Sequence, residues 1–397
     1  MKNSSTKRVC FVATTPAFVY MFSRNYISYL HDRGWDITVV TAPDQQGFGK
    51  RDYNQELRSR NAKMVYVPMK REPSLLCDCY TLLRLVWFFI WNRFDIVHCS
   101  HPKTMLLGTI AAFLAFAPNR MITVRGRPYE NYSGGLKRRF FILCDRIACG
   151  LARKNIVVST SLKNAMLKDK IGSNKSLIVF GHGSSQGCDA VFFSPEAVPD
   201  ESTVKLRMEC RLKDSDKIIL FSGRVRKDKG VVELVKAFDL LSKDAPDWHL
   251  ILIGHEEKIS DVGKEIRELM HKQPAIHHFD WSSDLRSFYK LADIFVLPTW
   301  REGFPNVILE ASAMTLPVVT TDAVGAVDSV VDGETGYIVP VGNVDILMDK
   351  VKYLMERPQL RKTMGQNGRK RVIDDFDPNM IWQYIHELYM KTAFPKS

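Results

Sequence analysis

The chain carries two glutamates, Glu302 and Glu310, in the segment REGFPNVILEASA. The strand-like run DIFVLPT precedes this segment, and Pro305 suits the first turn of a helix. We therefore expect a loop that turns into a helix, with Glu302 just before its start and Glu310 a little over one turn into it. Carboxylates at such positions can hold hydroxyl groups, and the helix start between them can bind an anion.

The start of that helix has the properties of a diphosphate site. The backbone N–H groups around Gly303, Phe304 and Asn306 precede the first complete helical turn, and the helix dipole is positive at this end. Glu310 could accept hydrogen bonds from two adjacent ribose hydroxyls, as an acid does in dinucleotide-binding folds. On the pair alone a plainer interpretation stands, in which Glu302 complements the helix dipole and Glu310 pairs with a nearby lysine.

A second loop supplies positive charge at the same edge of the expected sheet. SGRVRKDKG, which ends at Gly230, also follows a strand and opens a helix, and it brings Arg224 and Lys229. Two cations and a helix start that converge on one point can neutralise a leaving diphosphate without a metal ion. We interpret Arg226 and Lys227 as a solvated basic turn.

These loops belong to a chain in which strand-like and helix-like patterns alternate throughout. The first half contains the runs KRVCFVATT, WDITVVTAP and FDIVHCS, and the second half contains DKIILFSGR, HLILIG and LPVVTT. Continuous apolar runs of this kind are typical of parallel strands whose two faces are both covered by helices. The predicted fold class is therefore α/β, with two doubly wound, Rossmann-like domains facing across a cleft.

A polar stretch, SPEAVPDEST, separates the two halves. Its two prolines and three acidic residues are typical of a linker. We place an N-terminal domain at residues 1–195 and a C-terminal domain at residues 196–377. A last helix, within residues 378–397, is expected to pack back toward the first domain.

Charge is distributed unevenly between the two halves. Residues 1–195 hold 28 Lys and Arg against 12 Asp and Glu, whereas residues 196–397 hold 28 against 32. A basic half can face an anionic surface such as phospholipid or a lipid diphosphate, or it can be only a soluble basic face.

The eight cysteines form no CxxC pair, which favours a reducing compartment. The longest apolar stretch has 14 residues, whereas a membrane span needs about 20.

The second half of the chain resembles the retaining glycosyltransferases of family 4, which have the GT-B architecture, and above all their capsular and O-antigen polysaccharide branch. The resemblance rests on SGRVRKDKGVVELVKAF, on the E-x7-E segment within HFDWSSDLRSFYKLADIFVLPTWREGFPNVILEASAMTLPVV, and on FDPNMIWQYIHELY. It spans essentially the whole second domain. In the first domain it is looser and is carried by VHCSHPKTMLLG, TVRGRPYE and GHGSSQGCDAVFF.

This resemblance implies transfer of a sugar, with retention, from a nucleotide-sugar to a lipid-linked saccharide, with UDP-sugar as the preferred donor. It implies that the first domain binds the acceptor and that the second binds the nucleotide-sugar. Within the second domain, it implies that Glu302 lies at the donor sugar, Arg224 and Lys229 at the diphosphate and Glu310 at the ribose. No cofactor and no metal is expected. The expected partners are the nucleotide-sugar, the lipid-linked acceptor and an anionic membrane touched peripherally on its cytoplasmic face, and no nucleic acid.

Other residues enter the expected site through the same resemblance. Arg125, in TVRG, stands where relatives often have histidine, and a guanidinium can bind phosphate or sugar but cannot act as a base. Trp281 is expected near the nucleotide base. On the acceptor side, Thr15 stands where relatives often have a glycine-rich loop, and Lys103, at a helix start, is a candidate contact for an acceptor phosphate. Ala326–Asp328 replaces a more polar stretch, for which we have no functional account.

Alternative interpretations remain at this stage. A nucleotide-sugar epimerase of the same fold and a non-enzymatic basic binder of nucleic acid or another anion are the two competing functions. The DxD matches at Asp214–Asp216 and Asp375–Asp377 are interpreted as turn or cap acids rather than metal ligands. For the helix TLLRLVWFFIWNRF, which carries Trp87 and Trp91, we favour burial against its own sheet over contact with a membrane interface.

Overall fold

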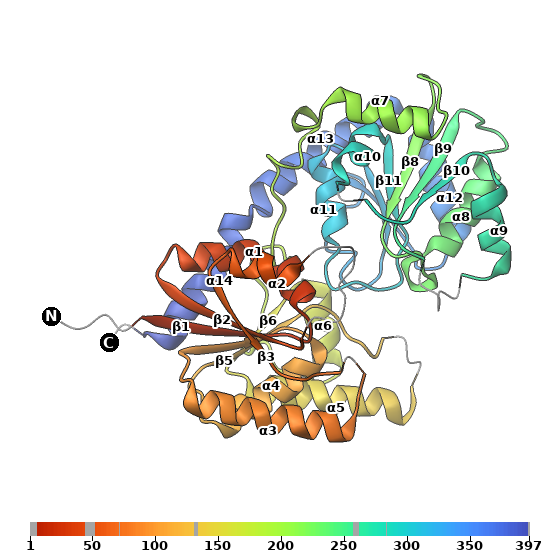
Figure 1. The fold of residues 1–397 in the computed structure, drawn as a ribbon. Coiled ribbons are helices and arrows are strands. Elements are labelled where there is room, and N and C mark those ends of the chain that lie inside the picture. Colours follow the sequence, from red (N-terminus) through yellow and green to blue (C-terminus); the bar gives the residue numbers. More distant parts are fainter. Residues whose placement is uncertain are drawn as a thin grey trace. The chain divides into compact units, whose positions relative to one another are not determined.

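Figure 1 shows the chain as a computed structural model, which describes residues 6–43, 52–70, 72–130, 134–256, 262–282 and 284–395. The chain divides into two compact units, unit 1 with Met1–Gln186 and Asn379–Ser397, and unit 2 with Gly187–Pro378. Each unit contains one parallel sheet, with a helix between most pairs of successive strands. The predicted α/β class with two doubly wound sheets is confirmed.

Unit 1 is built on a seven-stranded parallel sheet with the order β3-β2-β1-β4-β5-β6-β7. The chain starts in the middle at β1, runs outward to β3 and then returns to the other side of β1, so β1 and β4 form the switch point of the sheet. The first strand is buried from Val9 to Val12, as expected for a strand covered on both faces. The strands are β1 (Lys7–Val12), β2 (Trp35–Thr41), β3 (Ala62–Tyr66), β4 (Ile96–Cys99), β5 (Arg120–Val124), β6 (Lys154–Val157) and β7 (Leu177–Ile178).

Helices cover both faces of this sheet, with α1 and α14 on one face and α3, α4 and α5 on the other (Figure 1). Helix α14 comes from the end of the chain, and its Ile381 and Tyr389 pack into the core of unit 1 beside Trp35. The Tyr389 hydroxyl also hydrogen-bonds Nδ1 of the buried His98 on β4. The helices of unit 1 are α1 (Pro16–His31), α2 (Tyr53–Arg58), α3 (Leu75–Trp91), α4 (Pro102–Leu114), α5 (Gly135–Leu151), α6 (Thr160–Lys168) and α14 (Pro378–Ala393).

Unit 2 repeats the same construction on a six-stranded parallel sheet with the order β10-β9-β8-β11-β12-β13. Here β8 and β11 are the central neighbours, so the loops that follow them lie at one edge of the sheet. The strands are β8 (Lys217–Ser222), β9 (Trp248–Ile253), β10 (Ile276–Phe279), β11 (Ile294–Leu297), β12 (Val318–Thr321) and β13 (Gly336–Val339). The helices are η1 (Pro195–Ala197), α7 (Asp200–Glu209), η2 (Lys227–Lys229), α8 (Val231–Leu241), α9 (Lys264–Lys272), α10 (Arg286–Leu291), α11 (Asn306–Ala313), α12 (Val344–Met355) and α13 (Pro358–Asp375).

The stretch interpreted as a linker is largely structured and belongs to unit 2. Helix α7 begins inside it, because Pro199 ends the extended segment and Asp200 and Glu201 place negative charge in the first helical turn. The units divide between Gln186 and Gly187, rather than after residue 195. Gly187 is held within unit 2 by its close approach to Phe376, where an added Cβ would lie 2.3 Å from the carbonyl oxygen.

The preference for burial of the tryptophans on α3 was wrong. Leu85 and Phe89 are buried, whereas Trp87 and Trp91 are 63% and 70% exposed. The helix is apolar on both sides, so its composition alone does not indicate which side is covered. Among the described residues, no helix combines the length and hydropathy that a membrane crossing needs.

Asp145 is a buried carboxyl on the inner side of α5. Because of this residue, we expect the free energy of unfolding to depend measurably on pH. Burial raises its pKa from 3.8 to about 7, although the charge of Arg127 acts in the opposite direction. Since the folded state then holds a proton that the unfolded state releases, this contribution to stability is full below pH 3.8 and is lost as the pH rises through about 7.

We expect Asp145→Asn to remove this dependence. The stability of the variant relative to wild type should increase by up to about 4 kcal/mol between pH 4 and pH 8, at about 1.36 kcal/mol per unit of pKa. Urea unfolding at both pH values measures the difference directly. An equal effect of the substitution at pH 4 and pH 8 would contradict it, since only a titrating carboxylate makes the effect depend on pH.

Candidate active site

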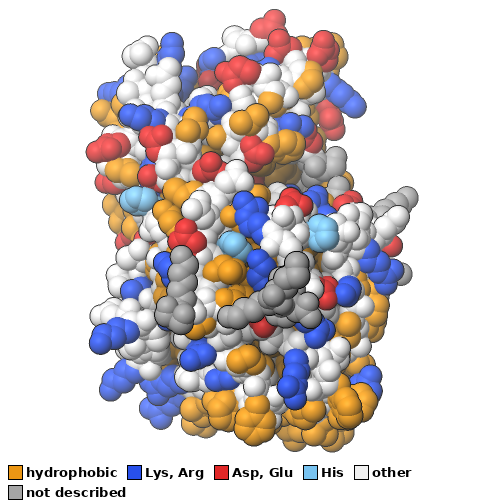
Figure 2. Space-filling view, turned by 90° about the vertical axis from the view of Figure 1, so that its left-hand side faces the viewer, with side chains coloured by type: hydrophobic (Ala, Val, Ile, Leu, Met, Phe, Trp, Pro, Cys, Tyr) orange, Lys and Arg blue, Asp and Glu red, His pale blue; other side chains and the backbone are white. Residues whose placement is uncertain are grey.

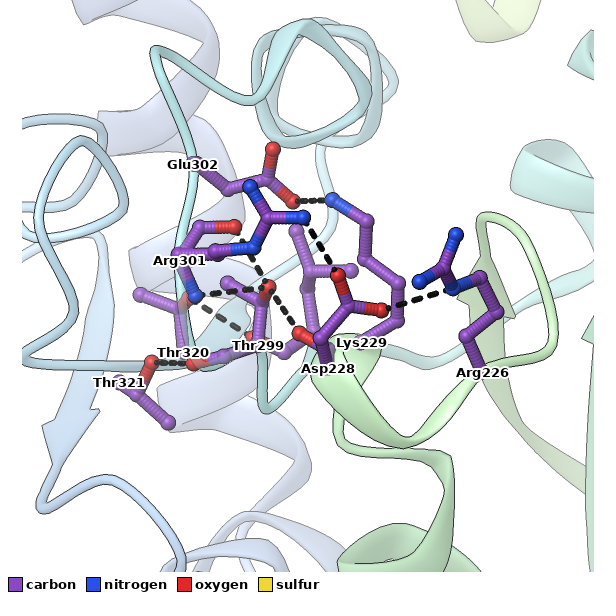
Figure 3. Close-up of polar contacts among 9 residues, drawn as sticks. Arg226, Asp228, Lys229, Thr299, Arg301, Glu302, Thr320 and Thr321 are labelled. Atoms are coloured by element: carbon purple, nitrogen blue, oxygen red, sulfur yellow. Dashed lines mark hydrogen bonds and ion pairs between the residues drawn. The ribbon is translucent and has the colours of Figure 1, made fainter. Parts of the chain in front are cut away.

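The loops after β8 and β11 bring a lysine and a glutamate together at one edge of the second sheet. Nζ of Lys229 lies 2.5 Å from Oε1 of Glu302, and the two side chains are only 15% and 17% exposed (Figure 3). The sequence predicted this convergence, because the carboxyl ends of adjacent parallel strands meet at the same edge. The result is a cation and a carboxylate in direct contact and largely shielded from water.

Lys229 is positioned by a tight turn that requires glycine at the next residue. The short 3₁₀ helix η2 ends at Gly230, whose φ of +73° lies in the left-handed region. A Cβ at this position would meet the carbonyl oxygen of Pro298 at 1.9 Å. Only glycine therefore allows the η2 turn to lie directly on the segment that leaves β11.

Hydrogen bonds between the two loops hold this contact. The backbone carbonyl of Asp228 accepts hydrogen bonds from the Thr299 hydroxyl at 3.1 Å and from the Trp300 N–H at 3.0 Å. The Thr321 hydroxyl, at the end of β12, donates to the Thr299 carbonyl at 2.5 Å (Figure 3). Three successive loops at the sheet edge are thus linked, so the position of Glu302 depends on all of them.

The side chain of Asp228 organises the charges around the pair. Its carboxylate accepts a hydrogen bond from Nη2 of Arg301 at 2.9 Å and lies 3.2 Å from Nε of Arg226. Burial acts to raise the pKa of this carboxyl, but Arg301, Arg226 and Lys229 lower it by more, so its pKa is below the ordinary value. Asp228 and Arg301 were not predicted, and Arg226 is not the solvated residue that the sequence suggested.

The loop that carries Glu302 is held from its other side by the segment after β12. The Glu302 N–H donates to the carbonyl of Val324 at 3.0 Å. Gly325 has a φ of +83°, and an added Cβ would lie within 2.6 Å of the Glu302 and Gly303 carbonyl oxygens. This close approach of two backbones fixes the loop at the start of α11, where the anion site is expected.

Glu310 lies on α11, as predicted, and contacts a buried tyrosine. The Tyr289 hydroxyl, on α10, donates a hydrogen bond to Oε2 of Glu310 at 3.0 Å. Burial raises the pKa of Tyr289 well above its ordinary value, and the negative charge of Glu310 raises it further. Tyr289 therefore remains a neutral donor that orients the carboxylate, which is the role of a residue supporting a binding group.

The other predicted residues of unit 2 surround this edge with different degrees of burial. Gly303 is buried, Phe304 packs against Phe376 with ring centroids 5.5 Å apart, and Asn306 begins α11. Arg224 is half-buried in the turn after β8, and Trp281, just past the end of β10, is 67% exposed. An exposed indole at this sheet edge is available to a ligand without any rearrangement of the core.

Arg125 is the predicted unit 1 residue with the features of a binding group. It directly follows β5, its Nε donates to the Ser185 hydroxyl at 3.2 Å, and burial lowers its pKa to about 10. Its guanidinium lies 5.0 Å from the ring centroid of Phe22. Within the described part of the chain, its Nη1 is buried without a hydrogen-bond partner, which is costly unless a ligand supplies one.

Thr15 and Lys103 are the two predicted acceptor contacts. Among the described residues, both side chains form hydrogen bonds within unit 1. The Thr15 hydroxyl caps α1 by accepting a hydrogen bond from the Phe18 N–H. Nζ of Lys103 donates to the Lys70 and Glu72 carbonyls and to the Asp78 carboxylate, at 2.6 to 2.7 Å. With its three protons engaged in this way, Lys103 holds the segment before α3, and this geometry gives no support to an acceptor contact.

Neither DxD match forms a ligand cluster. Asp216 is buried, accepts a hydrogen bond from the Lys213 N–H and lies 3.3 Å from Nε2 of His249. Asp375 ends α13 and lies 3.9 Å from Arg371. No group of three or more potential metal ligands occurs among the residues that the structure describes.

Two family models match the chain, one in each half. "Glycosyltransferase Family 4" matches residues 22–179, and "Glycosyl transferases group 1" matches residues 205–371. The second match contains the whole cluster of Lys229, Glu302 and Glu310.

Similar proteins match along almost the whole chain. The capsular polysaccharide biosynthesis glycosyltransferase CapM of Staphylococcus aureus is 33% identical over 366 residues, which cover 92% of each chain. An N,N'-diacetylbacillosaminyl-diphospho-undecaprenol alpha-1,3-N-acetylgalactosaminyltransferase of Campylobacter jejuni is 25% identical over 96% of this chain and 98% of its own. Among solved structures, Anabaena HepE in complex with UDP and glucose has a TM-score of 0.79 at 19% identity, covering 96% of this chain and 98% of its own.

Proposed function

Because the chain belongs to glycosyltransferase family 4 and has the GT-B fold, we propose that it transfers a sugar from UDP-sugar, with retention, to a lipid-linked saccharide during capsular or O-antigen polysaccharide synthesis. The observation that carries the proposal is the shielded Lys229–Glu302 pair at the start of α11. A carboxylate for the sugar and a cation for the diphosphate stand side by side there. The relatives named above, one with an undecaprenol-linked acceptor and one bound to UDP, support the two substrate classes.

In the proposed reaction, the bond between the anomeric carbon and the diphosphate oxygen breaks, and a bond to the acceptor hydroxyl forms on the same face. The acceptor's proton passes to an oxygen of the leaving diphosphate, so no enzymic base is required. Glu302 holds sugar hydroxyls and offsets the positive charge that develops on the ring. Arg224, Lys229 and the N–H groups around Gly303, Phe304 and Asn306 hold the negative charge of UDP.

The remaining residues have supporting roles in this proposal. Glu310, oriented by Tyr289, accepts hydrogen bonds from the ribose hydroxyls. The backbone near Trp281 contacts the base, and Arg125 supplies its unpartnered Nη1 to a phosphate or sugar oxygen. No metal and no cofactor enters the mechanism, and the protein acts at the cytoplasmic face of a membrane that it touches peripherally.

Thermal unfolding in the presence of nucleotides tests the donor site. We expect UDP, and not GDP, TDP or CMP, to raise the melting temperature without added metal, since a ligand at 100 times its Kd stabilises the folded state by about 2.7 kcal/mol. Glu310→Ala should abolish this shift because it removes the acceptor for the ribose hydroxyls.

Tyr289→Phe is the matched comparison for this experiment. It removes the hydroxyl that orients Glu310 but leaves the carboxylate, so the UDP shift should be reduced and not abolished. If both variants lose the shift equally, Glu310 acts through packing around Tyr289 rather than through the ribose. If no nucleoside diphosphate shifts the wild type, the transferase proposal fails.

A further inference from the structure

The outer side of α3 presents a continuous apolar stripe to solvent. Leu76, Tyr80, Leu83, Trp87 and Trp91 recur at helical spacings of three and four residues, and all five are at least 50% exposed. Trp87 and Trp91 contact each other, with ring centroids 5.9 Å apart. The opposite side of the same helix already fills the core of unit 1, so packing within the described chain does not account for this stripe.

Helix α5 repeats the pattern next to it. Leu136, Phe140, Leu143 and Ile147 follow the same helical spacing and are exposed, whereas Ile142 faces inward. Helix α4 lies between α3 and α5 and packs against both. It ends in the exposed Phe113 and Leu114, and the 91% exposed Phe116 follows two residues later. We call this surface, formed by the outward side chains of α3, α4 and α5, the apolar face.

The apolar face is visible at the foot of Figure 2, where hydrophobic side chains gather below a band that includes Lys and Arg. In Figure 1 the same region holds α3, α4 and α5. Monomeric soluble proteins rarely expose contiguous apolar patches beyond a few hundred Å², and larger ones mark contact with a membrane or another protein.

The charges on these three helices are almost all positive. Arg84 shares the α3 stripe with Tyr80 and Trp87 at spacings of four and three, and Arg139 shares the α5 stripe with its neighbours in the same way. Both arginines are exposed. The helices contain only two carboxylates. Asp78 is paired with Lys103, and Asp145 is buried.

We propose that the apolar face docks on the surface of an anionic phospholipid bilayer, with the three helices lying parallel to it. An apolar stripe with interspersed arginines and tryptophans has the composition of a helix that lies in the interface of an anionic membrane. A second copy of the chain would suit this surface less well, because a two-fold contact would bring its arginines toward one another without carboxylates between them.

The reason for the protein to bind a membrane rests on the proposed function, in which the acceptor is lipid-linked. The membrane binding itself does not depend on that acceptor. Vesicle binding is measured without donor or acceptor, and UDP binding is measured without vesicles. A failure of one proposal is therefore distinguishable from a failure of the other.

Co-sedimentation with phosphatidylcholine vesicles, with and without about one third phosphatidylglycerol, tests the docking surface. Wild type should partition onto the anionic vesicles and be released by salt. Leu83→Ser with Trp87→Ser should lower this partition at least tenfold. The matched control, Met208→Ser, replaces an equally exposed apolar side chain on α7 of unit 2 and should change nothing.

A second pair of variants separates charge from apolar contact. Arg84→Glu with Arg139→Glu should abolish the preference for anionic vesicles, whereas Lys352→Glu on the exposed side of α12 should not. All these positions are exposed, so the UDP-induced thermal shift should remain and report that each variant is folded.

Three outcomes would overturn the proposal. Wild type could fail to bind anionic vesicles, or both double variants could bind as wild type does. Alternatively, wild type could sediment without lipid as a dimer that Leu83→Ser with Trp87→Ser dissociates, in which case the occupant of the apolar face is a second copy.

Discussion

Glu302→Gln is expected to lower kcat about 10²- to 10³-fold while leaving UDP affinity unchanged or slightly higher. A preorganised charge aimed at the developing charge of a transition state is typically worth about 2.7 to 4 kcal/mol, and glutamine keeps the shape of the side chain but loses the charge. The substitution also removes the carboxylate that lies 2.5 Å from Nζ of Lys229.

The effect on UDP follows from that contact. Lys229 is only 15% exposed, and a diphosphate can neutralise it once Glu302 has lost its charge. Initial rates at saturating donor and calorimetric titration with UDP measure the two quantities separately. Glu356→Gln, an exposed glutamate at the end of α12, is the control and should leave both unchanged.

Two results would count against this role for Glu302. Transfer at the wild-type rate would remove it from the reaction. A parallel loss of UDP affinity and turnover would instead make Glu302 a structural partner of Lys229, because an interaction made only in the transition state lowers kcat without weakening ground-state binding.

Gly230→Ala is expected to destabilise unit 2 by about 2 to 5 kcal/mol and to abolish UDP binding. The left-handed backbone costs a residue with a Cβ about 1 to 2 kcal/mol, and overpacking typically adds about 1 to 3 kcal/mol. Here the new Cβ would lie 1.9 Å from the Pro298 carbonyl oxygen, so the η2 turn must move away from β11. That movement separates Lys229 from Glu302.

Gly333→Ala is the matched control for the backbone term alone. Gly333 has a φ of +77°, close to that of Gly230, but an added Cβ would meet nothing within 4 Å. Its cost should be limited to about 1 to 2 kcal/mol, with UDP binding retained. Urea unfolding and the UDP-induced thermal shift are measured for both variants. Equal destabilisation by the two substitutions would show that the contact between the new Cβ at position 230 and the Pro298 carbonyl oxygen adds no free-energy cost.

The sequence predicted the positions of site residues that depend only on the order of the strands and helices. Lys229 and Glu302 could be placed together because their loops follow strands of one parallel sheet, and Glu310 because Pro305 marks the start of its helix. The β8–β11 adjacency itself follows from the doubly wound class, which the alternating patterns predict. These inferences need only the order of the elements.

Other features depend on geometry that a sequence does not reveal. Asp228 pairs with Arg301 and Arg226 because the η2 turn directs its carboxylate toward both guanidinium groups. The sequence RKDK alone indicates only a charged turn. Lys103 resembles a phosphate ligand at a helix start, yet Asp78, 25 residues earlier, engages it. The sequence does not indicate which side of α3 is buried, because both sides of the helix are apolar.

Helix α14 makes the order of synthesis matter for folding. Trp35 and His98 are made before unit 2, but Tyr389, which packs against both, is made only after all of unit 2. Domains generally fold as units while the chain is being made. Unit 2 can therefore complete its core first, and the face of the N-terminal sheet that α1 and α14 share stays partly uncovered until α14 has been made.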